Sequence, residues 1–517
     1  MKFCNFVVPF FLLKTLIMNY TNHNLADTIV ALATPAGVGA IGVIRLSGTA
    51  AISIANAVFE GKNLEKQKSH TLHFGAIKTA AGRILDEVLA SVFVAPRSYT
   101  RENIVEISCH GSPYIQQQIL QLLLSHGARM AQPGEFTLRA FMNGQLDLSQ
   151  AEAVADVIAS SSESSHAIAI QQMRGGFSDE IKRLRQELIN FASLIELELD
   201  FGEEDVEFAN RDALKVLIAK IQGIIKKLLD SFAIGNVLKN GVSTVIAGRP
   251  NAGKSTLLNA LLNEDRAIVS EIAGTTRDTI EEILNIEGIE FRLIDTAGIR
   301  EATDAIEALG VAKTMEKVRQ SAILVYVFDV VETKLDEVLA DINELVRADT
   351  KLLVVCNKMD RNPHFRPEWL LNPSDETIPP FFFTTKYLSE VQNPTSNSHI
   401  TPSVFYTISP LNADQIITIS AKEGMNIPYL KEKLFNIVTE GGLNQASIIV
   451  SNVRHFEALQ KSYANLGDVL RGMTTGVTSD FIAMDIRHAL SALGEITGEI
   501  STDDLLETIF SKFCIGK

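Results

Sequence analysis

Cysteine is scarce in this chain, and its four residues lie far apart at Cys4, Cys109, Cys356 and Cys514. No two of them have the C-x-x-C spacing of a zinc site, and they form no pattern typical of a disulfide framework. Such sparse thiols are typical of a reducing compartment, so we expect a cytoplasmic protein.

Basic side chains are also in deficit, because 47 Lys and Arg stand against 62 Asp and Glu, which gives a net charge of −15. Nucleic acids bind to positively charged surfaces, and the overall charge does not indicate such a partner. If RNA binds to this chain, it must therefore meet a local patch or a second protein.

Apolar runs of membrane-spanning length are missing as well. Residues 3–17 are apolar, but the run is too short and too interrupted for a spanning helix, and no small-residue cleavage pattern follows it. We interpret residues 1–17 as an upstream extension before a true start at Met18, with a signal peptide and a membrane-surface segment as the alternatives. No membrane partner is expected.

The length of 517 residues predicts two to four domains. Before residue 140, short apolar runs alternate with turns, which predicts an α/β domain. The expected strands lie at 28–34, 40–47, 73–77, 88–95 and 103–109. The one expected helix lies at 113–127.

From Asp147 onward the apolar residues have helical spacing, and residues 434–510 are helical again. The stretch between these two helical flanks has the alternating strands and helices of a nucleotide domain. We therefore expect an α/β protein with an N-terminal domain, a helical domain built from two chain segments, and a nucleotide domain inserted into it. The expected boundaries are 18–140, 141–240 with 434–517, and 241–433.

Residues 248–255 read G-R-P-N-A-G-K-S, which is the G-x-x-x-x-G-K-[ST] phosphate-binding loop. A buried-strand pattern precedes it at 242–247, and a helix pattern follows it. Its glycines allow backbone N–H groups to surround phosphates, while Lys254 can reach the β- and γ-phosphates and Ser255 can ligate Mg²⁺.

Three further motifs follow in the order expected of a guanine-nucleotide site. D-T-A-G at 295–298 offers Asp295 to hold Mg²⁺ through water and the Gly298 N–H to sense the γ-phosphate. N-K-M-D at 357–360 ends in a carboxylate that can accept two N–H bonds from guanine, whereas adenine has no matching donors. S-A-K at 420–422 fits a loop that cradles the base. Together the motifs predict a Ras-like GTP-binding domain.

One stretch does not fit this pattern, because 59 residues separate Asp360 from Ser420 and small GTPases need far fewer. The spacer 361–419 includes the runs P-P-F-F-F and N-P-T-S-N-S-H. We interpret part of it as a surface insertion.

Longer motifs make the chain resemble one family. They are G-T-T-R-D at 274–278, D-T-A-G-I-R-E, P-G-E-F-T-L-R-A-F at 133–141, A-T-P-A-G-V-G-A-I-G-V-I-R-L-S-G near the start, and the terminal F-C-I-G-K. With the phosphate loop, they resemble the bacterial and organellar tRNA-modifying GTPase family called MnmE or TrmE. The resemblance covers Asp27 to Lys517, and the spacer and the N-terminal extension depart from the family pattern.

This resemblance implies a homodimer that forms through the N-terminal domain, which binds a reduced folate such as 5,10-methylenetetrahydrofolate or its 5-formyl analogue. It implies an FAD-dependent partner protein in a heterotetramer. The pair adds an aminomethyl or carboxymethylaminomethyl group to C5 of the wobble uridine, U34, of certain tRNAs. GTP hydrolysis, stimulated by K⁺ through association of two G domains, is needed for this modification.

Ile299 follows the D-T-A-G motif at a position where many GTPases have a glutamine that orients the attacking water, and no arginine finger can be identified. The resemblance implies a K⁺ ion instead, and it places Thr276 with Ser255 on Mg²⁺. Glu307 matches the catalytic glutamate of the family, although alone it would read as a solvated helix residue. The implied K⁺ ligands are Asn251, Ser270, Ile272 and Thr275. The expected GTP-binding residues are Asn251, Ala252, Gly253, Lys254, Ser255, Thr256, Ser270, Glu271, Ile272, Ala273, Gly274, Thr275, Thr276, Asp295, Thr296, Ala297, Gly298, Asn357, Lys358, Met359, Asp360, Ser420, Ala421 and Lys422.

Arg45 and Glu106 match folate contacts of the family, since an arginine suits the folate glutamate and a carboxylate suits the pterin N–H edge. A salt bridge between the two residues is the plainer alternative. Lys517 matches a further contact, and Gln145 stands where a lysine or arginine is usual, which weakens one contact. Cys514 is either a nucleophile toward uridine C6 or a packed tail residue.

A regulatory GTP switch acting in ribosome assembly is the rival interpretation, and a GTPase tethered to a membrane by residues 3–17 is a weaker third. A generic switch needs neither a folate-type N-terminal domain nor the F-C-I-G-K end, so these two features favour the enzyme.

Overall fold

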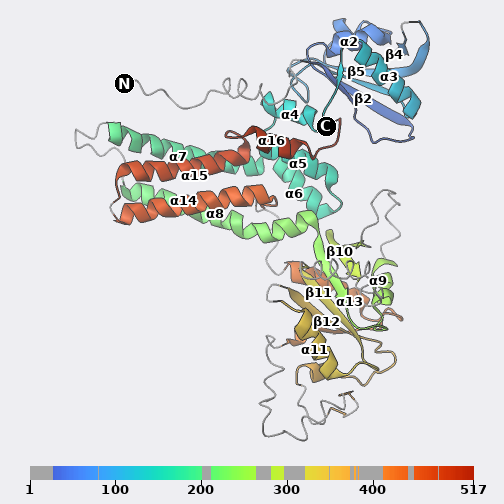
Figure 1. The fold of residues 1–517 in the computed structure, drawn as a ribbon, viewed down its shortest axis with the longest axis vertical. Coiled ribbons are helices and arrows are strands. Elements are labelled where there is room, and N and C mark those ends of the chain that lie inside the picture. The colour runs from blue at the N-terminus through green and yellow to red at the C-terminus, as the bar shows by residue number, and fades with distance from the viewer. Residues whose placement is uncertain are drawn as a thin grey trace, which may run out of the picture. The chain divides into compact units, whose positions relative to one another are not determined.

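The computed structural model describes residues 27–79, 81–200, 211–263, 281–295, 321–347, 350–372, 378–379, 382–383, 411–439, 448–475 and 477–516. The chain divides into two compact units, one of residues 1–159, 169–230 and 453–517 and one of residues 160–168 and 231–452 (Figure 1). Helices and sheets occur in both, so the predicted α/β class is confirmed. None of the described helices combines the length and the apolar character needed to cross a membrane. The extension 1–17 lies outside the described residues.

The first unit contains a seven-stranded sheet in the order β3-β4-β5-β6-β2-β1-β7, antiparallel except for the parallel pair β1 and β7. Helices α2 and α3 pack with one face of the sheet around a single apolar cluster. All five strands and the helix expected in this region are present. The elements are β1 (Ile29–Leu32), β2 (Ile41–Ser47), α2 (Ala51–Val58), β3 (Phe59–Glu60), β4 (Thr71–Lys78), β5 (Ile84–Phe93), β6 (Ile104–His110), α3 (Pro113–Ser125) and β7 (Arg129–Met130).

The rest of the first unit is helical and combines segments from both flanks of the chain. Figure 1 shows α7, α15, α14 and α8 lying side by side, and the side chain of Gln222 on α8 donates to the carbonyl of Tyr463 on α14 at 3.1 Å. The helices are α4 (Glu135–Met142), α5 (Leu148–Ala159), α6 (Glu163–Met173), α7 (Gly176–Asp200), α8 (Arg211–Asn240), α14 (Val453–Thr475), α15 (Ser479–Thr497) and α16 (Asp503–Phe510). Two of the four boundaries between the units fall inside α6 and α8.

The second unit contains a six-stranded sheet in the order β13-β12-β11-β8-β10-β9, in which only β9 is antiparallel. Two separate apolar clusters cover its faces. Because the other strands are parallel, their carboxyl ends meet at one edge, where α/β proteins bind ligands. The elements are β8 (Val242–Ala247), α9 (Lys254–Asn263), β9 (Glu281–Ile286), β10 (Ile289–Asp295), β11 (Ile323–Asp329), α11 (Leu335–Leu345), β12 (Lys351–Asn357), β13 (Ile416–Thr418) and α13 (Ile427–Thr439).

The described part of the spacer 361–419 is packed against this sheet. Phe365, Trp369 and Phe382 are buried in the cluster that contains Phe328 of β11, with ring centroids of neighbouring pairs 4.9 to 5.9 Å apart. Phe382 and Phe383 of the P-P-F-F-F run are therefore part of the core. The residues between 383 and 411 lie outside the described residues.

Candidate functional site

The phosphate loop joins β8 to α9 at the carboxyl edge of the second sheet. Gly248 has a φ of 152°, and a Cβ there would collide with the carbonyl oxygen of Val327 on β11. Gly253 has a φ of 92°, and a Cβ would collide with the side chain of Asn357. Only glycine fits both positions, so the loop backbone can curve tightly enough to point its N–H groups inward.

Lys254 is buried at the start of α9, where its ammonium donates to the carbonyls of Gly248 at 2.9 Å and Arg249 at 3.0 Å. These bonds hold the charge at the centre of the loop, where phosphate oxygens would replace the carbonyls. Ser255 and Thr256 follow in the first turn, and both are exposed. The residues therefore fit a nucleotide triphosphate and its Mg²⁺ ion.

Asn357 connects the phosphate loop to both base-binding loops. Its side-chain amide donates to the carbonyl of Ala252 at 2.8 Å, and its amide oxygen accepts the backbone N–H of Ala421 at 3.0 Å. Ser420 donates its hydroxyl to the Asp360 carboxylate at 2.6 Å. The backbone N–H of Met359 donates to the carbonyl of Ile419 at 3.1 Å, and Lys422 is exposed. Three sequence motifs separated by up to about 170 residues thus meet in one place.

Most of the remaining expected nucleotide residues lie outside the described residues. Asp295 ends β10, but its side chain is not described. The segments Ser270 to Thr276 and Thr296 to Gly298, together with Glu307, lie outside the described residues. Of the expected K⁺ ligands, the structure thus places only Asn251, which is exposed in the phosphate loop with a φ of 61°.

In the first unit, Arg45 and Glu106 stand opposite each other on β2 and β6 and form a salt bridge. The Arg45 guanidinium donates through Nε to Glu106 Oε1 at 2.8 Å, and it lies 5.8 Å from the ring centroid of Tyr99 and 5.7 Å from that of Phe136. The plainer alternative is therefore present in the structure. The carbonyl of Gly516 accepts from Arg45 at 3.4 Å, so the end of the chain reaches this pair.

Gln145 does not contact that pair through a hydrogen bond. Its side-chain oxygen accepts from Arg101 Nε at 2.9 Å instead. Cys514 is exposed, so it is not a packed core residue, and the backbone N–H of Gly134 donates to its carbonyl at 3.4 Å. Lys517 lies outside the described residues.

Two family models match the chain. One is described as the MnmE helical domain and matches residues 148–514, and one is described as the GTP-binding protein TrmE N-terminus and matches residues 28–145. A tRNA modification GTPase MnmE of Cytophaga hutchinsonii is 54% identical over 497 residues, which cover 96% of this chain and 99% of that protein. The chain belongs to the MnmE family. The proteins of that name from Flavobacterium psychrophilum and Bacteroides fragilis are 52% and 47% identical, each over 95% of this chain.

Among solved structures, Aquifex aeolicus Era bound to GDP.AlF4- aligns with 43% of this chain and 66% of its own, at 22% identity. Its TM-score of 0.24 is too low to support any conclusion about this MnmE protein.

Two groups that no sequence motif predicted support the nucleotide site of this chain. Asp329 is buried at the end of β11, and its carboxylate accepts a hydrogen bond from Lys358 Nζ at 2.7 Å. This bond fixes the side chain of Lys358, whose backbone has a φ of 67°. The sequence contained a signal, because Asp329 ends a strand that is otherwise entirely apolar. A buried carboxylate needs a partner of this kind.

The second missed group fixes the outer turn of the phosphate loop. Arg249 donates to both carboxylate oxygens of Asp341 on α11, at 2.8 and 3.2 Å, and pairs with Glu337 at 2.7 Å. Tyr326 donates its hydroxyl to Asp341 at 2.7 Å. The hydrogen bond to Asp341, together with that to Glu337, raises the pKa of Arg249. Nothing in the sequence spacing of these residues indicated the contact.

Proposed function

We propose that this chain is a GTP-hydrolysing enzyme of tRNA modification that acts in the cytoplasm. Its curated relatives carry the name tRNA modification GTPase MnmE at up to 54% identity over nearly the whole chain. One observation supports the GTPase activity best. The side chain of Asn357 forms hydrogen bonds to the phosphate loop and to the loop after β13.

In this proposal, Lys254 turns from its two carbonyl partners to the β- and γ-phosphates of GTP. Ser255 and Thr276 would hold Mg²⁺, which would supply positive charge against the phosphates. Asp360, positioned by Ser420, accepts the two N–H groups of guanine. The polar atoms of Lys254, Ser420 and Asp360 lie at the carboxyl edge of the second sheet.

We further propose that K⁺ supports hydrolysis, held by Asn251, Ser270, Ile272 and Thr275, and that Glu307 positions the attacking water through a second water. Ile299 has no hydrogen-bonding group in its side chain, so another group must orient that water.

For the tRNA reaction, we propose that the chain and an FAD-dependent partner modify C5 of the wobble uridine with a one-carbon unit from a reduced folate. Arg45, Glu106, Gln145 and Lys517 are the proposed folate residues, and Cys514 is the proposed nucleophile toward uridine C6. Its exposure allows access to a substrate.

A homodimer is part of the same proposal. Phe74, Leu72 and Leu89 on β4 and β5 are 67%, 59% and 39% exposed, and the sheet register pairs Phe74 with Leu89. A cluster of apolar side chains on the sheet face away from α2 and α3 is typical of a surface that a second copy covers.

The test is the mass spectrum of tRNA nucleosides from a strain that lacks the gene, complemented with either the wild-type chain or Lys254→Ala. We expect the C5-substituted wobble uridine to disappear on deletion and to return only with the wild-type chain. An unchanged nucleoside in the deletion strain would refute the tRNA role. Full restoration by Lys254→Ala would refute the need for GTP.

A further inference from the structure

An open pocket of about 780 Å³ lies in the first unit, beside the ends of β5 and β6. A volume in this range fits a small organic ligand. None of the proposed GTP residues lines it, and of the proposed folate residues only Gln145 does. Its lining residues are His70, Phe93, Pro96, Arg97, Ser98, Tyr99, Arg101 and Gln145.

The lining combines flat rings with positive charge. His70, Phe93 and Tyr99 supply rings, Arg97 and Arg101 supply guanidinium groups, and no Asp or Glu belongs to the lining. In a chain with a net charge of −15, such a local excess of arginine is a positive patch of the kind that RNA would need. Single-stranded RNA is bound by stacking of its bases on rings or guanidinium planes and by contacts of arginine with its phosphates.

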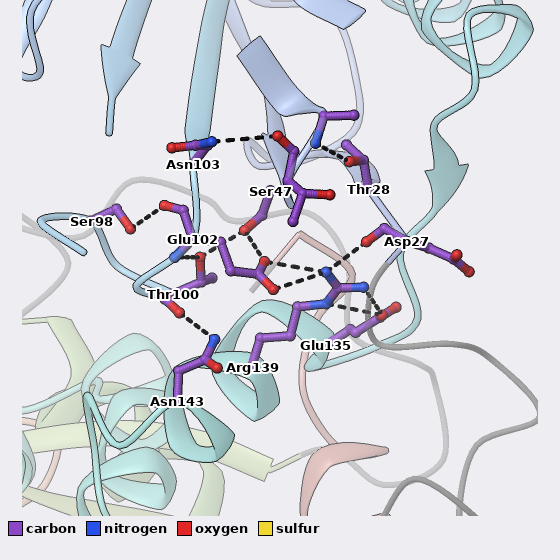
Figure 2. Close-up of polar contacts among 12 residues, drawn as sticks. Asp27, Thr28, Ser47, Ser98, Thr100, Glu102, Asn103, Glu135, Arg139 and Asn143 are labelled. Carbon is purple, nitrogen blue, oxygen red and sulfur yellow. Dashed lines mark hydrogen bonds and ion pairs between the residues drawn. The ribbon is translucent and has the colours of Figure 1, made fainter. Parts of the chain in front are cut away.

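The loop 96–101 carries the two arginines, and a network of hydrogen bonds to buried residues stabilises it. Figure 2 shows Arg139 of α4 reaching Glu102 and Glu135, and Arg139 is 1% exposed. Arg139 donates to Glu102 at 3.2 Å, Asn143 donates to the carbonyl of Thr100 at 2.7 Å, and Ser98 donates to the carbonyl of Glu102 at 2.6 Å. These contacts keep the loop in one conformation, so a ligand would meet a site that is already formed.

Two lining residues have a strained backbone. His70 and Arg101 have φ values of 64° and 58°, and only six non-glycine residues in the described part of the chain have a positive φ. Two of the other four, Asn251 and Lys358, belong to the nucleotide motifs. Strain of this kind persists where the surrounding structure enforces it and is concentrated at functional sites.

The pocket shares the Tyr99 ring with the Arg45–Glu106 pair, because the Arg45 guanidinium lies 5.8 Å from the centre of that ring. We propose that this pocket binds one unstacked nucleotide of single-stranded RNA, with its base against the Tyr99, His70 or Phe93 ring and its phosphate on Arg97 and Arg101. This proposal rests on the proposed function, in which the anticodon loop of a tRNA must bring its wobble base close to the folate site. The chain as a whole is acidic, so RNA would need a local positive patch, and the two arginines of this pocket supply one.

The test is photo-cross-linking of the full chain to an anticodon stem-loop RNA that carries 4-thiouridine at the wobble position, with the cross-linked peptide identified by mass spectrometry. We expect the cross-link on the segment 96–101 or on His70 or Phe93. Arg97→Ala should lower the RNA affinity about tenfold, as measured by fluorescence anisotropy. Arg97 is exposed and its guanidinium has no hydrogen bond or ion pair to any described residue, so its loss does not endanger folding.

Arg83→Ala is the matched control, because Arg83 is an exposed arginine of the turn between β4 and β5 whose guanidinium has a single 3.3 Å bond to Tyr114. A cross-link mapped elsewhere, or equal RNA affinity of Arg97→Ala and wild type, would overturn the pocket. Calorimetry with 5-formyltetrahydrofolate is the second readout. If Arg97→Ala weakens folate binding and leaves RNA binding unchanged, the pocket belongs to the folate site and the proposal is wrong.

The nucleoside spectrum separates this inference from the proposed function. Modified wobble uridine without a cross-link to the pocket would refute the inference alone. A cross-link to the pocket by a chain that does not modify tRNA would support the RNA site and refute the proposed function.

Discussion

At the scale of single residues, the nucleotide site depends on side chains that orient other side chains. Asn357 bonds to two loops, and Ser420 holds the carboxylate of Asp360 at 2.6 Å. Asp329 does the same for Lys358. These contacts fix the positions of Asp360 and Lys358 relative to the phosphate loop and the loop after β13, which reduces the side-chain ordering that binding requires.

Asp360→Asn should weaken GTP binding by about tenfold to a hundredfold and favour xanthosine triphosphate, because an amide places a donor opposite the donors of guanine. Titration with fluorescent analogues of both nucleotides measures the change. Asp414→Asn is the control, since Asp414 is an exposed carboxylate of the same unit. Equal GTP affinity of Asp360→Asn and wild type would contradict the assignment.

Glu106→Gln should lower the affinity of the full chain for 5-formyltetrahydrofolate by about tenfold, because it removes a charge-assisted acceptor from the pterin N–H edge. Calorimetry measures this loss, with Glu87→Gln on the neighbouring strand as the control. The salt bridge with Arg45 must open or share its carboxylate when the ligand binds. A wild-type chain that gives no heat with the folate would show that the pair is only structural.

At the scale of elements, the described part of the spacer behaves as an additional layer of the second unit. The short helix Pro367–Leu370 places Trp369 and Leu370 in the core, while the neighbouring Glu368 is exposed. The described residues of the spacer therefore add buried rings to the hydrophobic cluster around Phe328.

Trp369→Ala should destabilise the second unit by about 3 to 5 kcal/mol, because it removes a large buried ring that contacts Phe365 and Phe382. Denaturant unfolding in the presence and absence of GDP reports the loss, with Glu368→Ala as the adjacent exposed control. If both variants unfold at the same denaturant concentration as wild type, Trp369 does not belong to the core.

At the scale of the whole molecule, one buried ion cluster joins the two flanks of the chain in the first unit. Glu152 of α5 accepts from Arg454 at 2.7 Å and contacts His455 Nε2 at 2.8 Å, both at the start of α14. Burial opposes the charge of Glu152, but the attraction and hydrogen bonds of His455 and Arg454 outweigh it and lower the pKa of Glu152 to about 2.

Because the folded pKa of Glu152 is depressed, its contribution is present above its ordinary pKa of 4.5 and is lost as the pH falls toward 2. Glu152→Gln should therefore cost about 3 kcal/mol of unfolding free energy at pH 7, and the difference from wild type should shrink between pH 4.5 and 2. Urea unfolding across this range tests it. Glu495→Gln, which changes an exposed pair with Lys461, should have little effect at any pH.

The proposed pairing of two G domains adds a prediction for the assembled protein. GTP turnover should fall on the order of tenfold or more when Na⁺ replaces K⁺ at equal ionic strength, since the ion substitutes for an arginine finger. Asn251→Ala should remove that difference. Steady-state phosphate release in both salts measures it, and equal wild-type rates would exclude the potassium mechanism.

The sequence by itself determined the features whose geometry is contained in a short segment. The expected strands of both sheets and the helical flanks were predicted correctly, because periodicity and local backbone conformation act over a few residues. The phosphate loop and the N-K-M-D and S-A-K motifs lie at strand ends, as their flanking patterns predicted. The family resemblance also rests on such contiguous motifs.

Only the tertiary structure decided which distant side chains meet. Arg454 and Glu152 are 302 residues apart in sequence, and Arg249 and Asp341 are 92 apart. No local pattern encodes such pairs, because each depends on how the sheets and helices pack. The same reason explains why Arg45 and Glu106 were left between two alternatives, and why the arginine-lined pocket could not be anticipated. A buried charge needs a partner, and the fold alone supplies it.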